Sequence, residues 1–337
     1  MRGVRAAPMM TSFHTKLRMT MLAAVLSGGL LSACAPRETE VLLRVRHGAP
    51  PTMPMHRALL KVASILQERS RGRIHLLVEA GLSLPYQIDE MLKGSDEISM
   101  SGMGSLSDYY PPLGALEAPY MFRDVDHFYH TVETPFWGSL VTEVERRSGL
   151  HVIDMWHQGV RQVTFRDQAA RSPAEFGRIK LRVPPSQMYV ECARVLGALP
   201  TTMNINDVRT AIRAGTVDGQ ENPLPTIEAM HFHDVCTYLV LTNHSITPIM
   251  PIVSAAFWKT LSESDRLLIT EAFREGGRYN RKIVEEEERE LIHEFEQSGM
   301  IVIRPDLRQF RDRAEKVWKR YGEVWGDSLV ARIQAVK

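Results

Sequence analysis

The sequence predicts an α/β protein of two lobes, and three observations support this prediction. Residues 41–101 alternate between short β-prone runs and segments with apolar residues at helical spacing, which is typical of a parallel sheet with covered faces. A second series of the same kind begins near residue 152. The third observation is a helical pattern without a break over residues 263–298. At 1.5 Å per residue it would extend roughly 54 Å, longer than one lobe of this size, so we expect it to brace both lobes.

Length and charge narrow the possible classes of protein. The chain has 337 residues, 44% of them hydrophobic, which suggests two domains, or one large one, each able to bury its own core. Its 41 basic and 40 acidic residues give a net charge of +1, so it lacks the large positive field of a non-specific nucleic-acid binder. The three cysteines are too few for a disulfide scaffold and lack the paired spacing of a structural zinc site. Cys192 and Cys236 could form one disulfide or remain buried thiols.

The first residues are expected to be a targeting segment. Residues 1–33 carry four bases and no acid, and they end in an apolar run that begins at Met19. This run is shorter than the roughly 20 residues of a membrane-spanning helix. It closes with the letters LSAC at Cys34, which resemble a bacterial lipobox. We therefore predict a lipoprotein signal peptide over 1–33, lipidation of Cys34 and a tether over 34–40. A plain secretory peptide with a chance cysteine is the alternative, and Met9, Met10 or Met19 are alternative starts.

The individual elements follow from the pattern in order along the chain. In the first series we expect strands over 41–47, 73–79 and 97–101, with helices over 55–70 and 87–93. In the second we expect strands over 152–156, 163–165 and 179–183, with helices over 186–197 and 208–214. Ligands on such sheets bind beyond the carboxyl ends of the strands, so the loops after His47, Glu79 and Ser101 are candidate walls of a site.

Local signals mark the ends of two helices. Asn204 or Asn206 is the expected N-cap of the helix that Gly215 ends. Ser262 and Asp265 form a capping-box pattern at the start of the long helix. Within that helix, Gly276-Gly277 is a candidate bend, and the acidic run over 285–290 is interpreted as a solvated face.

Three side chains are candidates for a carboxylate clamp. Arg182 stands at the end of a strand that Pro184 and Pro185 terminate, and its guanidinium has the fork geometry of a carboxylate. Asn222 is followed by Pro223, which favours an extended conformation and would fix the amide in place. Arg161 follows a glycine in the run WHQGVR and could supply a second cation.

Together these fragments resemble the solute-binding subunits of tripartite ATP-independent periplasmic (TRAP) transporters, the dicarboxylate-binding family. The residues that carry the resemblance are KLRVP at 180–184, LGALPTTM at 196–203, VDGQENPL at 217–224 and YLVLTNH at 238–244. Weaker agreement covers nearly the whole mature chain, including RHGAPPTMPMHRA at 46–58, EAPYMFRD at 117–124 and AFWKTLSESDR at 256–266.

The resemblance implies a two-lobed periplasmic binding protein fold with hinge strands and a long spine helix. We expect lobe 1 to comprise 41–158 plus 248–287, and lobe 2 to comprise 159–247 plus 288–337. The resemblance also implies that Arg182 forms the salt bridge to a ligand carboxylate, with Asn222 and Arg161 as companions. The further ligand-lining positions that it implies are Ile205, His47, Ser101 and Met103.

The expected function is capture of a small organic acid and its delivery to a TRAP-type membrane permease. We expect no catalysis, no cofactor, no metal and no nucleic-acid partner. No nucleophile elbow, P-loop or dinucleotide fingerprint is present, and His231 and His233 in an extended segment would offer at most two metal ligands. The expected form is a periplasmic monomer, attached to the membrane through a lipid on Cys34.

Several alternatives remain open at this point. They are a ligand-sensing lipoprotein of the same fold that reports to a receptor, and a hydrolytic enzyme. The acid itself could be a C4-dicarboxylate, a 2-oxo acid, an aromatic acid or a sugar acid.

Overall fold

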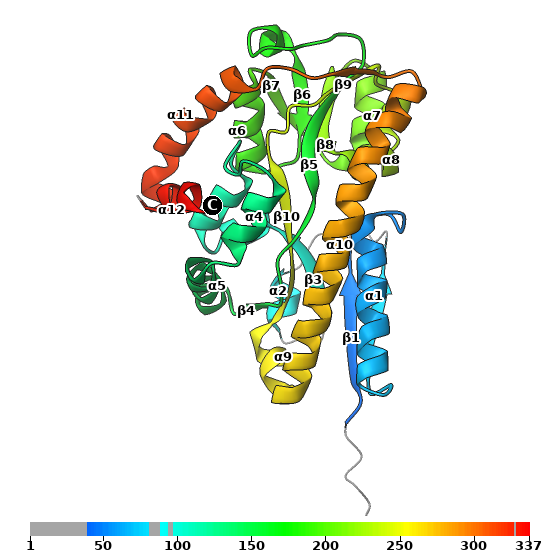
Figure 1. Cartoon of the computed structure of the whole chain (residues 1–337), viewed down its shortest axis with the longest axis vertical. Helices are drawn as coiled ribbons and strands as arrows, with labels where there is room; N and C mark the ends of the chain where they lie inside the picture. The colour runs from blue at the N-terminus through cyan, green and yellow to red at the C-terminus, as the bar shows by residue number, and fades with distance from the viewer. Residues whose placement is uncertain (1–38, 81–87, 94–96, 327) are drawn as a thin grey trace, which may run out of the picture. The chain divides into compact units, whose positions relative to one another are not determined.

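One path of strands runs through the protein, with helices packed around it (Figure 1). The computed structural model describes residues 39–80, 88–93, 97–326 and 328–337. All of them except Thr39 belong to one compact unit, Glu40–Lys337. The predicted signal peptide, Cys34 and nearly all of the predicted tether lie outside the described residues. Among the described residues, no helix is both long enough and apolar enough to span a bilayer.

The strand order along the main path is β2-β1-β3-β10-β5-β8-β6-β7. At one end β1 pairs in parallel with β2 and β3, and at the other end β6 pairs in parallel with β7 and β8. The antiparallel pair β5 and β10 joins the two ends, which is the expected arrangement of crossing strands. The strands are β1 (Val41–Arg46), β2 (Ile74–Glu79), β3 (Glu97–Gly102), β4 (Leu150–Val152), β5 (Trp156–Phe165), β6 (Lys180–Val183), β7 (Leu199–Thr202), β8 (Gly219–Pro223), β9 (Tyr238–Val240), β10 (Ile246–Ser254) and β11 (Ile301–Ile303).

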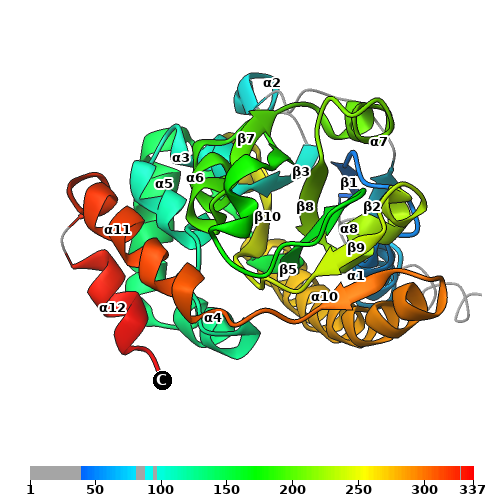
Figure 2. The same cartoon turned by 90° about the horizontal axis from the view of Figure 1, so that it is seen from above.

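Helices surround this sheet, as the view from above shows (Figure 2). They are α1 (Pro54–Arg69), α2 (Ile88–Leu92), α3 (Met103–Ser107), α4 (Val125–Val132), α5 (Pro135–Ser148), α6 (Gln187–Leu196), α7 (Ile205–Arg213), α8 (Leu224–Ala229), α9 (Ala255–Thr260), α10 (Glu263–Gln297), α11 (Arg308–Trp325) and α12 (Leu329–Ala335). The described part of the chain also contains the short 3-10 helices η1 (Pro111–Glu117), η2 (Glu175–Arg178) and η3 (Phe232–Asp234). Asn204 is the N-cap of α7, because its side chain accepts from the backbone N–H of Asn206 at 3.2 Å.

The long spine helix is present as α10, with 35 residues. Ser262 caps it as expected, accepting from the backbone N–H of Asp265 at 3.1 Å. The carboxylate of Asp265 does not reach back to complete a capping box; it instead accepts from Arg73 at the start of β2. Figure 1 shows α10 beside α1 and continuing past α8.

The two glycines of α10 allow close packing. A Cβ on Gly276 would lie 2.3 Å from the side chain of Val62, and one on Gly277 would lie 2.6 Å from the indole nitrogen of Trp156. Both glycines are buried. Any larger residue would force α10 away from α1 and from the crossing strand β5.

Two details differ from the sequence analysis. The predicted strands over 152–156 and 163–165 are instead the short β4 and one continuous strand β5 of 10 residues. The acidic run of α10 is not simply a solvated face, because Glu288 turns toward β5 and accepts from the backbone N–H of Val160 at 2.6 Å. Burial raises the pKa of Glu288 from 4.5 to about 8.

Among the described residues, the core consists of four groups of buried apolar side chains. The predicted lobe boundaries remain a prediction. The terminal helix α12, assigned to lobe 2, places Leu329 and Ile333 in the same group as Phe128 and Leu150 of lobe 1. Cys192 and Cys236 are free and buried, which corresponds to the thiol alternative.

Candidate functional site

A cavity of about 870 Å³ lies at the ends of the strands, where both ends of the sheet contribute to its wall. This volume is in the range of small-molecule sites. One side includes Gly102 of β3 and Gly104 of α3, and the other includes Arg182 of β6 and Asn222 of β8. The crossing strands β5 and β10 and the helix α11 complete the wall.

Arg182 reaches this cavity from the penultimate position of β6, as its placement before two prolines predicts. Its side chain is 2% exposed. Nε and Nη2 both donate to the carbonyl oxygen of Met203, at 3.0 and 2.8 Å. Nη1 has no hydrogen-bond partner among the described residues. Burial lowers the pKa of Arg182 to about 10, so the guanidinium is still a cation at neutral pH. Its Nη1 can donate hydrogen bonds to a ligand.

Arg161 also lines the cavity, but each nitrogen of its guanidinium donates a hydrogen bond within the protein. It forms an ion pair with Glu221, and both side chains are buried. Its Nη2 also donates to the Glu221 carbonyl at 2.8 Å, and its Nη1 donates to Thr247 Oγ1 at 3.2 Å. The guanidinium lies over the ring of Tyr189, 4.4 Å from the centroid. Arg161 therefore has its own counter-ion within the protein.

The charge of Glu221 is stabilised by its neighbours. Burial alone would raise the pKa of this carboxyl, but Arg161 and a hydrogen bond from His244 at 3.1 Å outweigh burial and hold the pKa below its ordinary value. Burial lowers the pKa of His244. Arg161, which lines the cavity, is thus charge-balanced by a buried partner.

Asn222 is extended within β8, as the following proline predicts. Its Oδ1 accepts from Arg161 Nη2 at 3.2 Å, and its Nδ2 donates to Gln220 Oε1 at 2.5 Å. The Gln220 amide in turn donates to Thr164 Oγ1 at 2.9 Å. This chain of hydrogen bonds fixes the orientation of the amide at the cavity wall.

The other predicted positions fall into two sets. Ile205 is half-buried at the start of α7 and lines the cavity. His47, Ser101 and Met103 are buried but are not part of the wall of this cavity. His47 contacts the ring of His56, with a nitrogen-to-nitrogen distance of 3.1 Å, and Met103 belongs to the core. A role of these three residues in binding stays a prediction.

Two acidic residues were missed by the sequence analysis: Glu117, which lines the cavity, and Glu221, the ion-pair partner of Arg161. Glu117, at the end of η1, is 2% exposed and accepts from the hydroxyl of Tyr189 at 3.0 Å. Burial raises the pKa of Glu117 to about 7. Glu117 stands in the EAPYMFRD run, but only the fold brings it next to Tyr189 of α6. Glu221 could have been found, since it directly precedes Asn222 in the DGQENP run.

Comparisons with known proteins agree with this geometry. Residues 45–323 match the family model described as DctP, bacterial extracellular solute-binding protein, family 7. The chain is 29% identical to the sialic acid-binding periplasmic protein SiaP of Vibrio cholerae over 91% of this chain and 96% of that protein. It is 28% identical to the 2,3-diketo-L-gulonate-binding periplasmic protein YiaO of Escherichia coli, over 80% and 83%. A solved TRAP periplasmic solute-binding protein from Ochrobacterium anthropi, with bound L-fuconate, superimposes with a TM-score of 0.81 at 26% identity, over 88% of this chain and 99% of that one.

Proposed function

The chain belongs to the bacterial extracellular solute-binding proteins of family 7, the solute-binding subunits of TRAP transporters, and from that premise we propose that its cavity captures a small organic acid through Arg182. Proteins of this family bind solutes and are not enzymes. The family places the protein outside the cytoplasm and pairs it with membrane permease subunits.

The observation that carries the proposal is that Arg182 is buried and, among the described residues, has no acidic partner for its hydrogen bonds. A guanidinium that is 2% exposed has lost most of its hydration, and two of its nitrogens find only a neutral carbonyl oxygen. A buried charge is costly unless it is paired and hydrogen-bonded. A ligand carboxylate supplies both the opposite charge and the acceptors that Arg182 lacks.

The charges around the cavity support an anion rather than a neutral ligand. Arg161 and Glu221 neutralise each other, so Arg182 contributes one uncompensated positive charge. Glu117 has a pKa raised to about 7, so at neutral pH it offsets only part of that charge. A monocarboxylate with hydroxyl groups fits this balance, because Glu117 and Asn222 can hydrogen-bond to hydroxyls while Arg182 holds the carboxylate.

The relatives bind ligands of this chemical class. Sialic acid, 2,3-diketo-L-gulonate and L-fuconate, named for the three proteins above, each carry one carboxylate and several oxygens. Other relatives are named for C4-dicarboxylate binding or were solved with succinate. We favour a sugar acid for this chain, since polar groups and not a second unpaired cation surround Arg182.

The position of the cavity between the two ends of the sheet supports delivery as part of the proposal. Because the cavity takes residues from both ends of the sheet, a ligand makes all its contacts only when the two ends approach, which favours a closed state by hinge motion. A permease can then recognise that closed state. We also propose attachment to the membrane through a lipid on Cys34, which rests on the LSAC motif.

A thermal-shift screen of organic acids tests the proposal. The purified unit Glu40–Lys337 is heated with sugar acids, dicarboxylates, 2-oxo acids and the amide of each acid that binds. Ligand at a hundredfold its dissociation constant adds about 2.7 kcal/mol to the free energy of unfolding. We expect a shift with an acid and none with its amide. Equal shifts with acid and amide would contradict the clamp, and shifts only with cations or neutral sugars would contradict the ligand class.

A further inference from the structure

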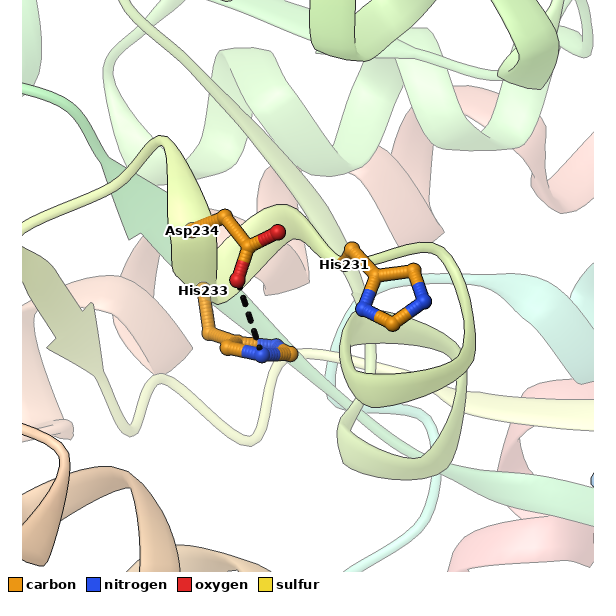
Figure 3. Close-up of side chains that lie close together, drawn as sticks. All are labelled: His231, His233 and Asp234. Atoms are coloured by element: carbon orange, nitrogen blue, oxygen red, sulfur yellow. Dashed lines mark ion pairs between the residues drawn. The ribbon is translucent and has the colours of Figure 1, made fainter.

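A second cluster of ligating side chains lies outside the organic-acid cavity. His231, His233 and Asp234 each offer one ligand atom, and these atoms all lie within 4.8 Å of one another (Figure 3). None of the three lines the larger cavity. The sequence analysis expected an extended segment with at most two ligands in view. The segment is instead the 3-10 helix η3, and its turn brings Asp234 to the histidines.

We propose that His231, His233 and Asp234 form a binding site for a divalent transition metal ion, with Zn²⁺ as the best match. Imidazole and carboxylate are the donors that zinc uses in three-ligand sites with an open fourth position. Bonds of 2.0–2.1 Å in tetrahedral geometry place ligand atoms about 3.3 Å apart. His233 Nε2 and Asp234 Oδ1 are already 3.2 Å apart. Figure 3 shows His231 on the adjacent turn; its side chain is exposed, and its ligand nitrogen lies within 4.8 Å of the other two ligand atoms.

The backbone and the ring of His233 are held in place by packing. Phe232, between the two histidines, is fully buried in the core group around Leu239 and Phe295. The imidazole of His233 stacks on Phe295 of α10, with centroids 5.4 Å apart and planes inclined by 27°. A site whose ligands are already oriented loses less entropy when the ion binds.

Two charged neighbours suit such a site. Glu228 Oε2 lies 3.1 Å from Nδ1 of His233, on the side of the ring away from Asp234. A small rotation makes that carboxylate the acceptor of Nδ1–H, the second-shell partner that fixes the tautomer of a metal-bound histidine. Arg209 pairs with Oδ2 of Asp234 and leaves Oδ1 toward the histidines. Asp234, Glu228 and Arg209 together carry a net charge of −1.

An acidic cavity borders the cluster at His231. A hollow of about 340 Å³ is lined by His231 and Glu228 together with Glu287, Glu290 and Glu294 of α10. Arg57 pairs with Glu287 at its edge. The excess of carboxylates attracts cations to this face and disfavours anions. The metal site and the organic-acid cavity therefore serve ligands of opposite charge.

Zinc titration of the unit Glu40–Lys337, with any affinity tag removed, tests this site. We expect one ion per chain, and affinity about ten- to a hundredfold lower in Glu228→Gln, since loss of a second-shell partner has that effect. His231→Ala and His233→Ala should each weaken binding more than Glu228→Gln. His130→Ala is the matched control, because His130 is exposed on α4 and lies outside the cluster.

The readouts separate this site from the rest of the protein. Circular dichroism checks that each variant is folded, and binding of the organic acid should be unchanged in all of them. Zinc affinity equal to wild type in both His231→Ala and His233→Ala would overturn the proposal, as would the absence of stoichiometric binding in the wild-type unit. An anomalous zinc peak between the His233 and Asp234 side chains in a soaked crystal would support it.

Discussion

Replacing Arg182 with methionine should separate ligand binding from stability. Burial lowers the pKa of this guanidinium from 12.5 to about 10, and at 1.36 kcal/mol per pKa unit that is a cost on the order of 3 kcal/mol in the ligand-free protein. Methionine removes this cost at similar length. It also removes two hydrogen bonds to the Met203 carbonyl, and an unsatisfied buried carbonyl costs roughly 1–3 kcal/mol. The two effects nearly cancel, so we expect the free energy of unfolding to change by less than about 2 kcal/mol.

The effect of the same substitution on binding should be much larger. Truncating one partner of a buried charge pair costs about 2–5 kcal/mol, which corresponds to a loss of affinity of roughly 30-fold to several thousandfold. Calorimetry with the acid identified in the screen measures the affinity, and urea unfolding of the ligand-free chain measures the stability.

Lys180→Met is the matched control, because Lys180 is exposed at the other end of β6. It should keep wild-type affinity. Wild-type affinity in Arg182→Met would refute the clamp. A loss of more than about 3 kcal/mol of stability in the ligand-free variant would refute the view that Arg182 is held at a cost for the ligand.

Two further predictions concern the crossing strand β5. Gly159→Ala should destabilise the protein by about 2–4 kcal/mol in urea unfolding. The reason is that φ of Gly159 is 124° and an added Cβ would lie 2.5 Å from Glu288 Oε1 and 2.9 Å from Pro223 Cβ. Gly177→Ala is the control, because a Cβ at Gly177 would enter open space. The second prediction concerns Glu288, whose pKa is raised from 4.5 to about 8. Between these two values the folded state binds a proton that the unfolded chain releases. The resulting contribution to stability is present at low pH and is lost as pH rises through 8. Glu288→Gln should therefore reduce the fall in the free energy of unfolding between pH 5 and about 8. Glu290→Gln is the control and should keep the wild-type pH profile. The same unchanged profile in Glu288→Gln would contradict the raised pKa of Glu288.

Much of the fold could be predicted because its signals are local. Apolar spacing and end signals gave α1 and the spine helix α10, whose N-cap at Ser262 the structure confirms. The two prolines after Val183 fix the end of β6 and hence the position of Arg182 at the cavity. The proline after Asn222 likewise keeps that residue extended. In each case residues within a few positions determine the outcome.

The remaining features depend on partners that are distant in the chain. Glu288 and Val160 meet across 128 residues, so the acidic run alone suggests a solvated face. Arg161 is joined to Glu221 across 60 residues, so the WHQGVR run alone could not reveal this ion pair, and a role of Arg161 in ligand binding stays a prediction. The third residue of the proposed metal cluster, Asp234, depends on a single 3-10 turn, which apolar periodicity does not reveal.

The contrast between the two arginines supports the proposal that one cavity combines stability with selection of an acid. Arg161 has a buried counter-ion in Glu221, so its charge is balanced whether or not a ligand is present. It can therefore hold Asn222 in place without attracting anions of its own. Arg182 has only a carbonyl oxygen for Nε and Nη2, and a guanidinium in that state gains most from an incoming carboxylate. If both arginines lacked counter-ions, we would expect the cavity to favour dianions. Because Arg161 is neutralised, the proposed clamp needs only a single carboxylate to balance the charge of Arg182, and we expect the hydrogen-bonding groups around it to select among acids.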